Sequence, residues 1–167
     1  RRYLDYGHGQ GEVTLHAAPL THGAGFLLLP TLAAAGTNVV VTRFEPGRIL
    51  RLMREERVTN GFLVPSMIQM LLDEPDTVLD TASGGLPDLK TLYYAGSPID
   101  PGTLRGAMQR FGGVLVQSFG QMESPMFLTV LDRRDHARIV DGSASHLIGS
   151  AGRPVSGAKV RIVDDDG

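Results

Sequence analysis

Segments with the period of a β-strand alternate along this 167-residue chain with segments that have the period of an α-helix. Strands are predicted in residues 12–19, 37–42, 59–65, 89–96, 114–119, 126–131 and 159–163. Helices are predicted in residues 25–36, 45–58, 66–74 and 100–112, and polar loops in residues 75–88 and 132–145. Repeated strand–helix–strand units favour a mostly parallel sheet with right-handed crossovers and flanking helices. We therefore predict an α/β fold.

Proline and aspartate mark where two of these helices begin. Asp100 is a candidate N-cap, and Pro101 suits the first helical position, where a missing N–H needs no partner. Pro46 fits the first turn of its helix for the same reason. Pro30 lies inside the predicted buried helix 25–36 and is a weakness in that prediction.

Composition excludes several classes of function. The net charge of −2 gives no basic face for nucleic acid, and no apolar run approaches the ~20 residues of a membrane span. The chain has no cysteine, which excludes disulfides and thiolate chemistry and agrees with a cytoplasmic location, our prediction. The five histidines show no metal-ligand spacing, and no Gly-x-Ser-x-Gly elbow supports a hydrolase serine.

Three segments place unusual residues at the carboxyl ends of predicted strands, where parallel α/β sheets bind their ligands. They are "APLTHG", "YYAGSP" and "QSFGQMES". Although these segments lie far apart in the sequence, the carboxyl ends of parallel strands meet at one edge of the sheet. We therefore expect the three segments to converge.

Each of these segments allows a functional and a purely structural interpretation. Glu123 offers a carboxylate for Mg²⁺, which shares phosphate oxygens with its substrate, or is a solvated loop acid. Phe119 offers a ring to stack on a flat base, or packs in the core. The turn at Gly96, Ser97 and Pro98 presents backbone groups to that base, or is a plain strand–helix turn. His22 lines a pocket for an acid, or is a structural histidine.

Four segments, in this order, resemble the adenylate-forming superfamily of acyl-CoA synthetases, peptide-synthetase adenylation domains and luciferases. "HAAPLTHGAG" is similar to its Pro-Leu-x-His segment, and "LKTLYYAGSPID" to its Gly-Gly/Ala-Pro-Leu turn. "VLVQSFGQMES" is similar to its Tyr-Gly-x-Thr-Glu motif, and "IGSAGRPVSGAKVRIVDDDG" to its Gly-Ser-x-Gly-x-Pro-x-Pro-Gly segment. The similarity runs from about residue 12 to residue 167 and favours the ligand interpretation of Glu123, Phe119 and the Gly96 turn.

The resemblance implies a reaction and a set of roles. An acid–CoA ligase activates a carboxylic acid, here a fatty or aryl acid, with ATP and Mg²⁺, and coenzyme A then takes the acyl group from the adenylate. Phe119 would stack on adenine, Glu123 would hold Mg²⁺, and His22 would border the acyl carboxylate. Residues that would line the base, the nucleotide or the acyl pocket are Gly96, Ser97, Pro98, Ser118, Gly120, Gln121 and Met122.

Two residues depart from the family pattern. Phe119 replaces the usual Tyr, which keeps stacking but loses the hydroxyl. Met122 stands where the family usually has a Thr that touches phosphate, and a thioether donates no hydrogen bond. Two other hypotheses therefore stay open. One is an adenylation domain that loads a carrier protein, and the other is a non-catalytic module that binds a nucleotide or a protein partner.

The resemblance also implies a domain organisation. Residues 1–167 would be a fragment of the large N-terminal domain, forming its flavodoxin-like subdomain, with residues 132–167 as the possible start of an adjoining β-rich subdomain. The family's phosphate loop would precede residue 1, and its small C-terminal domain would follow residue 167. We therefore expect little or no ligase activity from this fragment alone.

Overall fold

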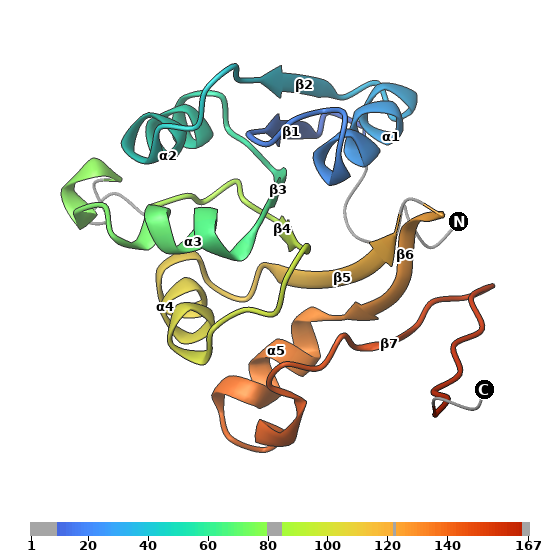
Figure 1. The fold of residues 1–167 in the computed structure, drawn as a ribbon. Coiled ribbons are helices and arrows are strands. Elements are labelled where there is room, and N and C mark those ends of the chain that lie inside the picture. The colour runs from blue at the N-terminus through green and yellow to red at the C-terminus, as the bar shows by residue number, and fades with distance from the viewer. Residues whose placement is uncertain (1–9, 80–84, 122, 165–167) are drawn as a thin grey trace.

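A seven-stranded sheet in the order β2-β1-β3-β4-β5-β6-β7 forms the centre of the molecule (Figure 1). The structure, a computed structural model, describes residues 10–79, 85–121 and 123–164. The strands are β1 (Val13–His16), β2 (Thr37–Val40), β3 (Asn60–Leu63), β4 (Thr91–Tyr94), β5 (Leu115–Gln121), β6 (Ser124–Leu131) and β7 (Arg153–Pro154). The α-helices are α1 (Leu28–Ala33), α2 (Pro46–Glu55), α3 (Pro65–Leu72), α4 (Pro101–Phe111) and α5 (Arg133–Val140). Short 3₁₀ helices cover Gly23–Leu27, Asp76–Val78 and Ser145–Leu147.

The predicted fold class is confirmed. Strands β2, β1, β3, β4 and β5 run parallel to one another. Strand β6 runs antiparallel to β5, and β7 runs antiparallel to β6. The chain is therefore an α/β protein with a mostly parallel sheet and flanking helices. In the described part of the chain, no helix has the length and apolar character needed to cross a membrane.

Helices cover both faces of the sheet, and each face has its own core (Figure 1). Successive residues of a strand point to opposite faces. In β4, Leu92 and Tyr94 therefore join the core under α2, α3, α4 and α5, whereas Tyr93 joins the core beside the Gly23–Leu27 helix. That second core is rich in aromatic rings: the Phe26 ring lies 5.2–5.9 Å, centroid to centroid, from those of Phe62, Tyr93 and Phe127.

The predicted start of α4 is confirmed. The Asp100 side chain accepts hydrogen bonds from the backbone N–H of Gly102 at 2.7 Å and of Thr103 at 3.1 Å. Pro101 is the first helical residue. Pro46 likewise begins α2.

The prediction of a loop over residues 132–145 is wrong, because the structure has α5 there. Asp132 is its N-cap and accepts from the backbone N–H of Arg134 at 2.8 Å and of Asp135 at 2.9 Å. The buried side of α5 consists of Asp135, His136 and Ile139. Since two of these three are polar, a search for apolar periodicity does not detect the helix.

Two further predictions need correction. Residues 159–163 form no strand, and the side chain of Ile162 is 92% exposed. The predicted buried helix 25–36 is a 3₁₀ turn followed by α1, on which Leu29 and Leu32 are exposed. Pro30 is the third residue of α1, so it lies in the first turn, where its missing N–H breaks no helical hydrogen bond.

A polar network closes the amino end of the strands. The carboxylate of Glu12, a buried residue, accepts a hydrogen bond from Lys90 Nζ at 2.8 Å and another from Asn60 Nδ2 at 3.0 Å. Asn60 Nδ2 also donates to Thr59 Oγ1 at 2.9 Å, and that hydroxyl donates to the Val13 carbonyl at 3.1 Å. The network joins β1, β3 and β4 across long separations in sequence.

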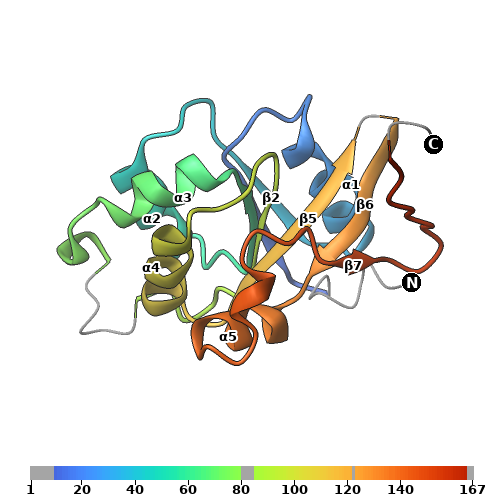
Figure 2. The ribbon, with the colours of Figure 1, turned by 60° about the horizontal axis from the view of Figure 1, so that its bottom comes forward.

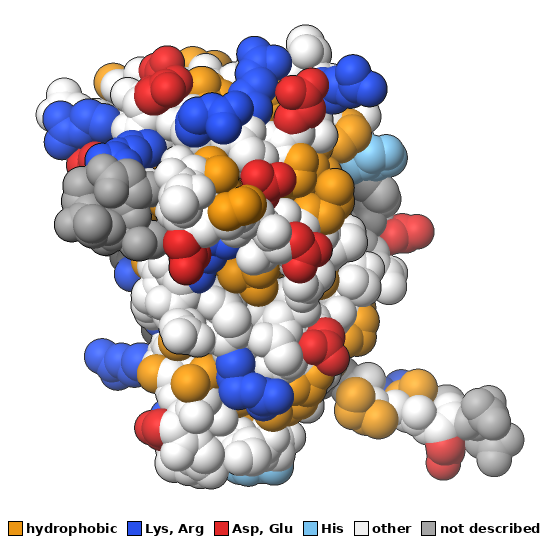
Figure 3. Space-filling view, turned by 90° about the vertical axis from the view of Figure 1, so that its left-hand side faces the viewer, with side chains coloured by type: hydrophobic (Ala, Val, Ile, Leu, Met, Phe, Trp, Pro, Cys, Tyr) orange, Lys and Arg blue, Asp and Glu red, His pale blue; other side chains and the backbone are white. Residues whose placement is uncertain are grey.

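The side of the molecule on which α2, α3 and α4 lie carries both signs of charge. Figure 3 shows blue and red side chains interspersed there with orange ones, and no region of one sign dominates the view.

Candidate functional site

The three unusual segments leave the sheet at the same edge. β1, β3, β4 and β5 are parallel neighbours, so their carboxyl ends lie together. The register pairs Tyr94 with Gln117. Gly96 and Phe119 each come two residues later, so they lie at the same level, Gly96 in the turn after β4 and Phe119 still in β5, where it pairs with Thr129 of β6. The convergence predicted for the segments that carry His22, Gly96 and Phe119 follows from this topology.

His22 lies in a tightly held loop after β1. Its backbone N–H donates to the Pro19 carbonyl at 3.1 Å, and its own carbonyl accepts from the Gly25 N–H at 3.0 Å. A Cβ at Gly25 would lie 2.0 Å from the Leu20 carbonyl oxygen, so only glycine fits there. His22 itself is exposed, and in the described part of the chain its side chain makes no hydrogen bond.

The turn at Gly96, Ser97 and Pro98 is exposed and has open space above it. Gly96 has φ of +94°, a conformation that favours glycine, and the nearest atom to a Cβ placed there would be in Val64, at 3.6 Å. A flat ring could therefore approach this backbone closely. The contact between the turn and a base stays a prediction.

Strand β5 carries the aromatic residue to the same edge. Ser118 is buried, whereas Phe119 is 42% exposed, and Gly120 and Gln121 are exposed. Phe119 belongs to none of the ring pairs seen among the described residues, so its face is free of aromatic neighbours there. The β5–β6 register shifts between Phe119 and Gln121. Such irregularities are over-represented next to active sites, where they redirect a side chain.

Glu123 lies in the turn between β5 and β6, two strands that run side by side in Figure 2. It is exposed, and no group of three or more His, Cys, Asp or Glu side chains able to hold a metal occurs in the described part of the chain. A single exposed carboxylate fits a Mg²⁺ ion that takes its other ligands from phosphate and water, and does not fit an all-protein cage. Met122, which stands where the family usually has a Thr that touches phosphate, lies outside the described residues.

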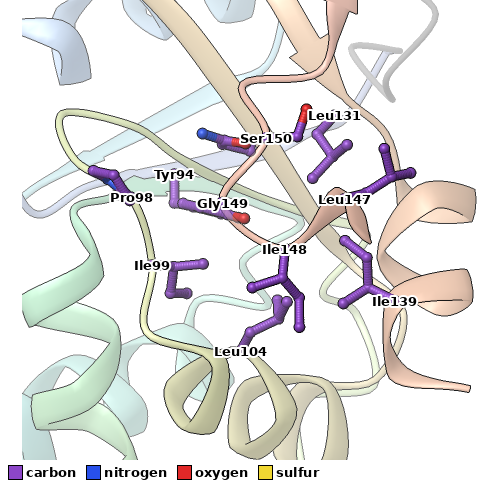
Figure 4. Close-up of a pocket in the computed structure, with 11 residues that line it drawn as sticks. Tyr94, Pro98, Ile99, Leu104, Leu131, Ile139, Leu147, Ile148, Gly149 and Ser150 are labelled. Carbon is purple, nitrogen blue, oxygen red and sulfur yellow. The ribbon is translucent and has the colours of Figure 1, made fainter. Parts of the chain in front are cut away.

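A small cavity lies under the Gly96–Pro98 turn, between α4, β5 and α5 (Figure 4). Its volume of about 10 Å³ is room for about one water molecule, so it is not the site of an organic substrate. Its walls come from Tyr94, Pro98, Ile99, Leu104, Gln117, Leu131, Ile139, Leu147, Ile148, Gly149 and Ser150. The cavity therefore marks where the turn meets α5 and the segment that follows it.

Sequence reasoning missed a buried hydrogen-bonded pair beside this cavity. Tyr94 Oη lies 2.9 Å from His136 Nε2, and His136 Nδ1 lies 2.6 Å from the Asp132 carbonyl oxygen. Burial raises the pKa of the Tyr94 hydroxyl, and burial lowers the pKa of His136 against the opposing effects of Asp132 and Asp135. Both side chains are therefore neutral near pH 7. The two residues are 42 apart in sequence, and no local signal links them.

Comparison with known proteins agrees with this architecture. The profile of the family described as AMP-binding enzyme matches residues 2–167. The chain is 37% identical over 153 residues to the medium/long-chain-fatty-acid–CoA ligase FadD8 of Mycobacterium tuberculosis, covering 92% of this chain and 25% of that protein. It is 35% identical over 158 residues to a feruloyl-CoA synthase of an Amycolatopsis species, covering 93% of this chain and 30% of that protein.

A solved structure shares the fold. The amide bond synthetase McbA of Marinactinospora thermotolerans superposes with a TM-score of 0.81 at 33% identity, over 97% of this chain and 31% of that one. The chain belongs to the AMP-binding enzyme family. It spans about a quarter to a third of the length of these relatives.

Proposed function

We propose that the full-length protein containing this chain is an AMP-forming acid–CoA ligase. It would join a carboxylic acid to ATP, releasing pyrophosphate, and then transfer the acyl group from the adenylate to the thiol of coenzyme A. The observation that carries the proposal is the parallel pairing of β1, β3, β4 and β5, which supports a common edge for the segments that carry His22, the Gly96 turn and Phe119. Membership of a family described by its binding of AMP supports the nucleotide as one substrate.

Each residue at this edge has a role that its chemistry permits. The exposed ring of Phe119 and the open backbone at Gly96 would hold the adenine between them. Ser118, Gly120 and Gln121 would lie along the nucleotide, and Ser97 and Pro98 would line the base and the neighbouring acyl pocket. Stacking between a base and an aromatic ring is worth about 1–3 kcal/mol in other proteins, which is enough to orient ATP.

His22 and Glu123 would act where charge changes. The exposed imidazole of His22 would border the acid carboxylate before it attacks the α-phosphorus. Glu123 would hold Mg²⁺, and the ion would supply positive charge that stabilises the reacting phosphate. Both side chains lack hydrogen-bond partners among the described residues, so neither must give up a protein contact to bind a ligand.

The acid is proposed to be a fatty or aryl acid. One relative is by its name a medium/long-chain-fatty-acid–CoA ligase and another a feruloyl-CoA synthase. The aromatic core around Phe26 lies behind the His22 loop, since a Cβ at Gly23 would lie 3.1 Å from the Phe62 ring. Apolar side chains this close to the proposed position of the carboxylate support an acid with an apolar tail. The cytoplasmic location stays a prediction.

The test is acid-dependent exchange of pyrophosphate into ATP by the full-length protein, with a panel of fatty and aryl acids. Thioester formation is then measured with coenzyme A and with a carrier protein. We expect exchange with one class of acid, its loss in Glu123→Gln, and a coenzyme A thioester as the product. Glu55→Gln, an exposed acid on α2, is the matched control and should retain full exchange.

Other outcomes would select the alternatives. A thioester on the carrier protein alone would favour the carrier-loading domain. Binding of ATP by a folded protein without exchange for any acid would favour the non-catalytic module, and would direct attention to Met122. Exchange that survives Glu123→Gln unchanged would remove Glu123 as the magnesium ligand.

A further inference from the structure

We propose that Tyr94 and His136 are positioning residues that hold the Gly96–Pro98 turn in place for ATP. The inference rests on the proposed function, because it takes that turn as the surface on which the base of ATP lies. Neither side chain would touch a substrate, since Tyr94 is 1% exposed and His136 is fully buried. Their effect would pass through the backbone that follows Tyr94.

The hydrogen bonds of this pair have a defined direction. The Asp132 carbonyl only accepts hydrogen bonds, so His136 Nδ1 carries the proton of that 2.6 Å contact. In the neutral ring, Nε2 is then the acceptor, and the Tyr94 hydroxyl donates to it at 2.9 Å. The two rings meet edge to face, with centroids 5.6 Å apart and planes at 77°. Tyr94 Oη and both ring nitrogens of His136 therefore all take part in hydrogen bonds.

The pair is well placed to control the turn. Tyr94 is the last residue of β4, and Gly96 follows it after a single residue. The turn itself is exposed, and a Cβ at Gly96 would meet only Val64 within 4 Å. The turn is therefore held mainly at its two ends. Tyr94 fixes the end at the sheet, and Ile99 with the Asp100 cap fixes the end at α4.

Two hydrogen bonds join helix α5 to β4. His136 contacts Tyr94, and Arg133, one helical turn earlier, donates through its guanidinium to the hydroxyl of Thr91. The same spacing of three residues thus occurs on the helix and on the strand. Asp135, buried on α5, also pairs with Arg153 at the start of β7. The helix is in this way fixed to the sheet on two sides, which gives His136 a rigid base.

A merely structural pair would stabilise the fold without affecting nucleotide binding, and the experiment separates the two cases. In the full-length protein, Tyr94→Phe removes only the hydroxyl. We expect the dissociation constant for ATP, measured without acid, and the KM for ATP to rise about tenfold, the effect of losing about one hydrogen bond, with little change in kcat. His136→Leu should behave in the same way, and His136→Gln, which keeps an acceptor, should restore part of the affinity.

Thr14→Val is the matched control. It also removes one buried hydroxyl, which lies 2.7 Å from Thr31 Oγ1, on strand β1 and away from the turn. We expect a fall in Tm similar to that of Tyr94→Phe, with unchanged affinity for ATP. Equal affinity for ATP in Tyr94→Phe and the wild-type protein would overturn the proposal, as would equal loss of affinity in Tyr94→Phe and Thr14→Val.

The test also distinguishes failure of this proposal from failure of the proposed function. If the wild-type protein binds ATP but catalyses no exchange, the ligase assignment fails, and the dissociation constants for ATP still decide the role of Tyr94. If the folded wild-type protein binds no ATP, both proposals are wrong. If exchange occurs and Tyr94→Phe leaves ATP binding unchanged, only the positioning role is wrong.

Discussion

Polar side chains at the two ends of the parallel strands differ in burial and in hydrogen bonding. At the amino end, Glu12, Asn60 and Thr59 are buried and linked by hydrogen bonds, with Lys90 on the Glu12 carboxylate. At the carboxyl end, His22 and Glu123 are exposed and have no hydrogen-bond partner among the described residues. Folding gives most polar groups at the amino end a hydrogen-bond partner, although Asn60 Oδ1 has none among the described residues, and leaves those at the other end available to a ligand. Changes at the amino end should therefore reduce stability, and changes at the carboxyl end should reduce activity.

The largest effect is expected from Gly25→Ala, at the carboxyl end. The new Cβ would lie 2.0 Å from the Leu20 carbonyl oxygen, so the loop that carries His22 must move. A displacement of about 1 Å at a reacting group can reduce the rate about 100-fold, and we expect a loss of acid-dependent exchange of that order. The measurement is kcat/KM for the acid, beside Tm.

Gly113→Ala is the control for this substitution. Gly113 is exposed, no atom lies within 4 Å of a Cβ placed there, and its φ is not positive. Both activity and Tm should stay at wild-type values. Full activity in Gly25→Ala would contradict the assignment of the His22 loop to the site.

An intermediate effect, on stability alone, is expected from Glu12→Gln at the amino end. The substitution removes the charge that Lys90 and Asn60 bind. Charged hydrogen bonds contribute about 1.5–3 kcal/mol, and the half-exposed ammonium of Lys90 reduces the expected loss to about 1–2 kcal/mol. Denaturant unfolding of the full-length protein measures this loss, and kcat/KM should remain unchanged.

The loss should depend on pH with a predictable sign. Burial raises the pKa of Glu12, but its neighbours, led by Lys90, outweigh burial and hold the pKa below its usual value of 4.5. A lowered pKa in the folded state contributes stability that is present above pH 4.5 and is lost as the pH falls through the lowered value. The difference between wild type and Glu12→Gln should therefore be constant near neutral pH and shrink below pH 4.5. A difference that grows on acidification would contradict this.

The same contrast explains how much of the molecule could be predicted from the sequence. The alternation of strands and helices is a local pattern, and so is the Asp100 cap, so the fold and α4 were predictable. The common edge of these segments was also predictable, because the carboxyl ends of parallel strands lie together, whereas the roles of Gly96, Phe119 and Glu123 stay predictions. Helix α5 was missed because Asp135 and His136, both polar, make up most of its buried side.

Long-range pairing accounts for the other errors. The sequence of residues 159–163 has the composition of a strand, but a strand forms only where another strand pairs with it, and no local pattern reveals that partner. The hydrogen bond between Lys90 and Glu12 joins residues 78 apart, and that between Tyr94 and His136 residues 42 apart. Sequence periodicity therefore reveals elements, whereas the polar contacts between elements needed the structure.

The smallest effect is expected from Arg57→Ala, which tests whether burial or charge makes the amino end important for stability. Arg57 follows α2, and its guanidinium binds the Asp88 carboxylate at 3.0 and 3.2 Å, just before Leu89 and β4. Asp88 raises the pKa of Arg57, and Arg57 lowers that of Asp88, as in any close ion pair. The Arg57 side chain is 77% exposed, so water and salt screen the attraction.

We therefore expect Arg57→Ala to leave the Tm of the full-length protein unchanged in 0.15 M salt, while Glu12→Gln lowers it. The two substitutions break ion pairs at the same end of the sheet and differ mainly in burial of the carboxylate. If Arg57→Ala lowered Tm as much as Glu12→Gln, proximity to the amino end would matter more than desolvation. Equal effects on Tm would mean that the two ends of the strands differ in surface charge. They would not then differ in whether their polar groups are hydrogen-bonded within the protein or free to bind a ligand.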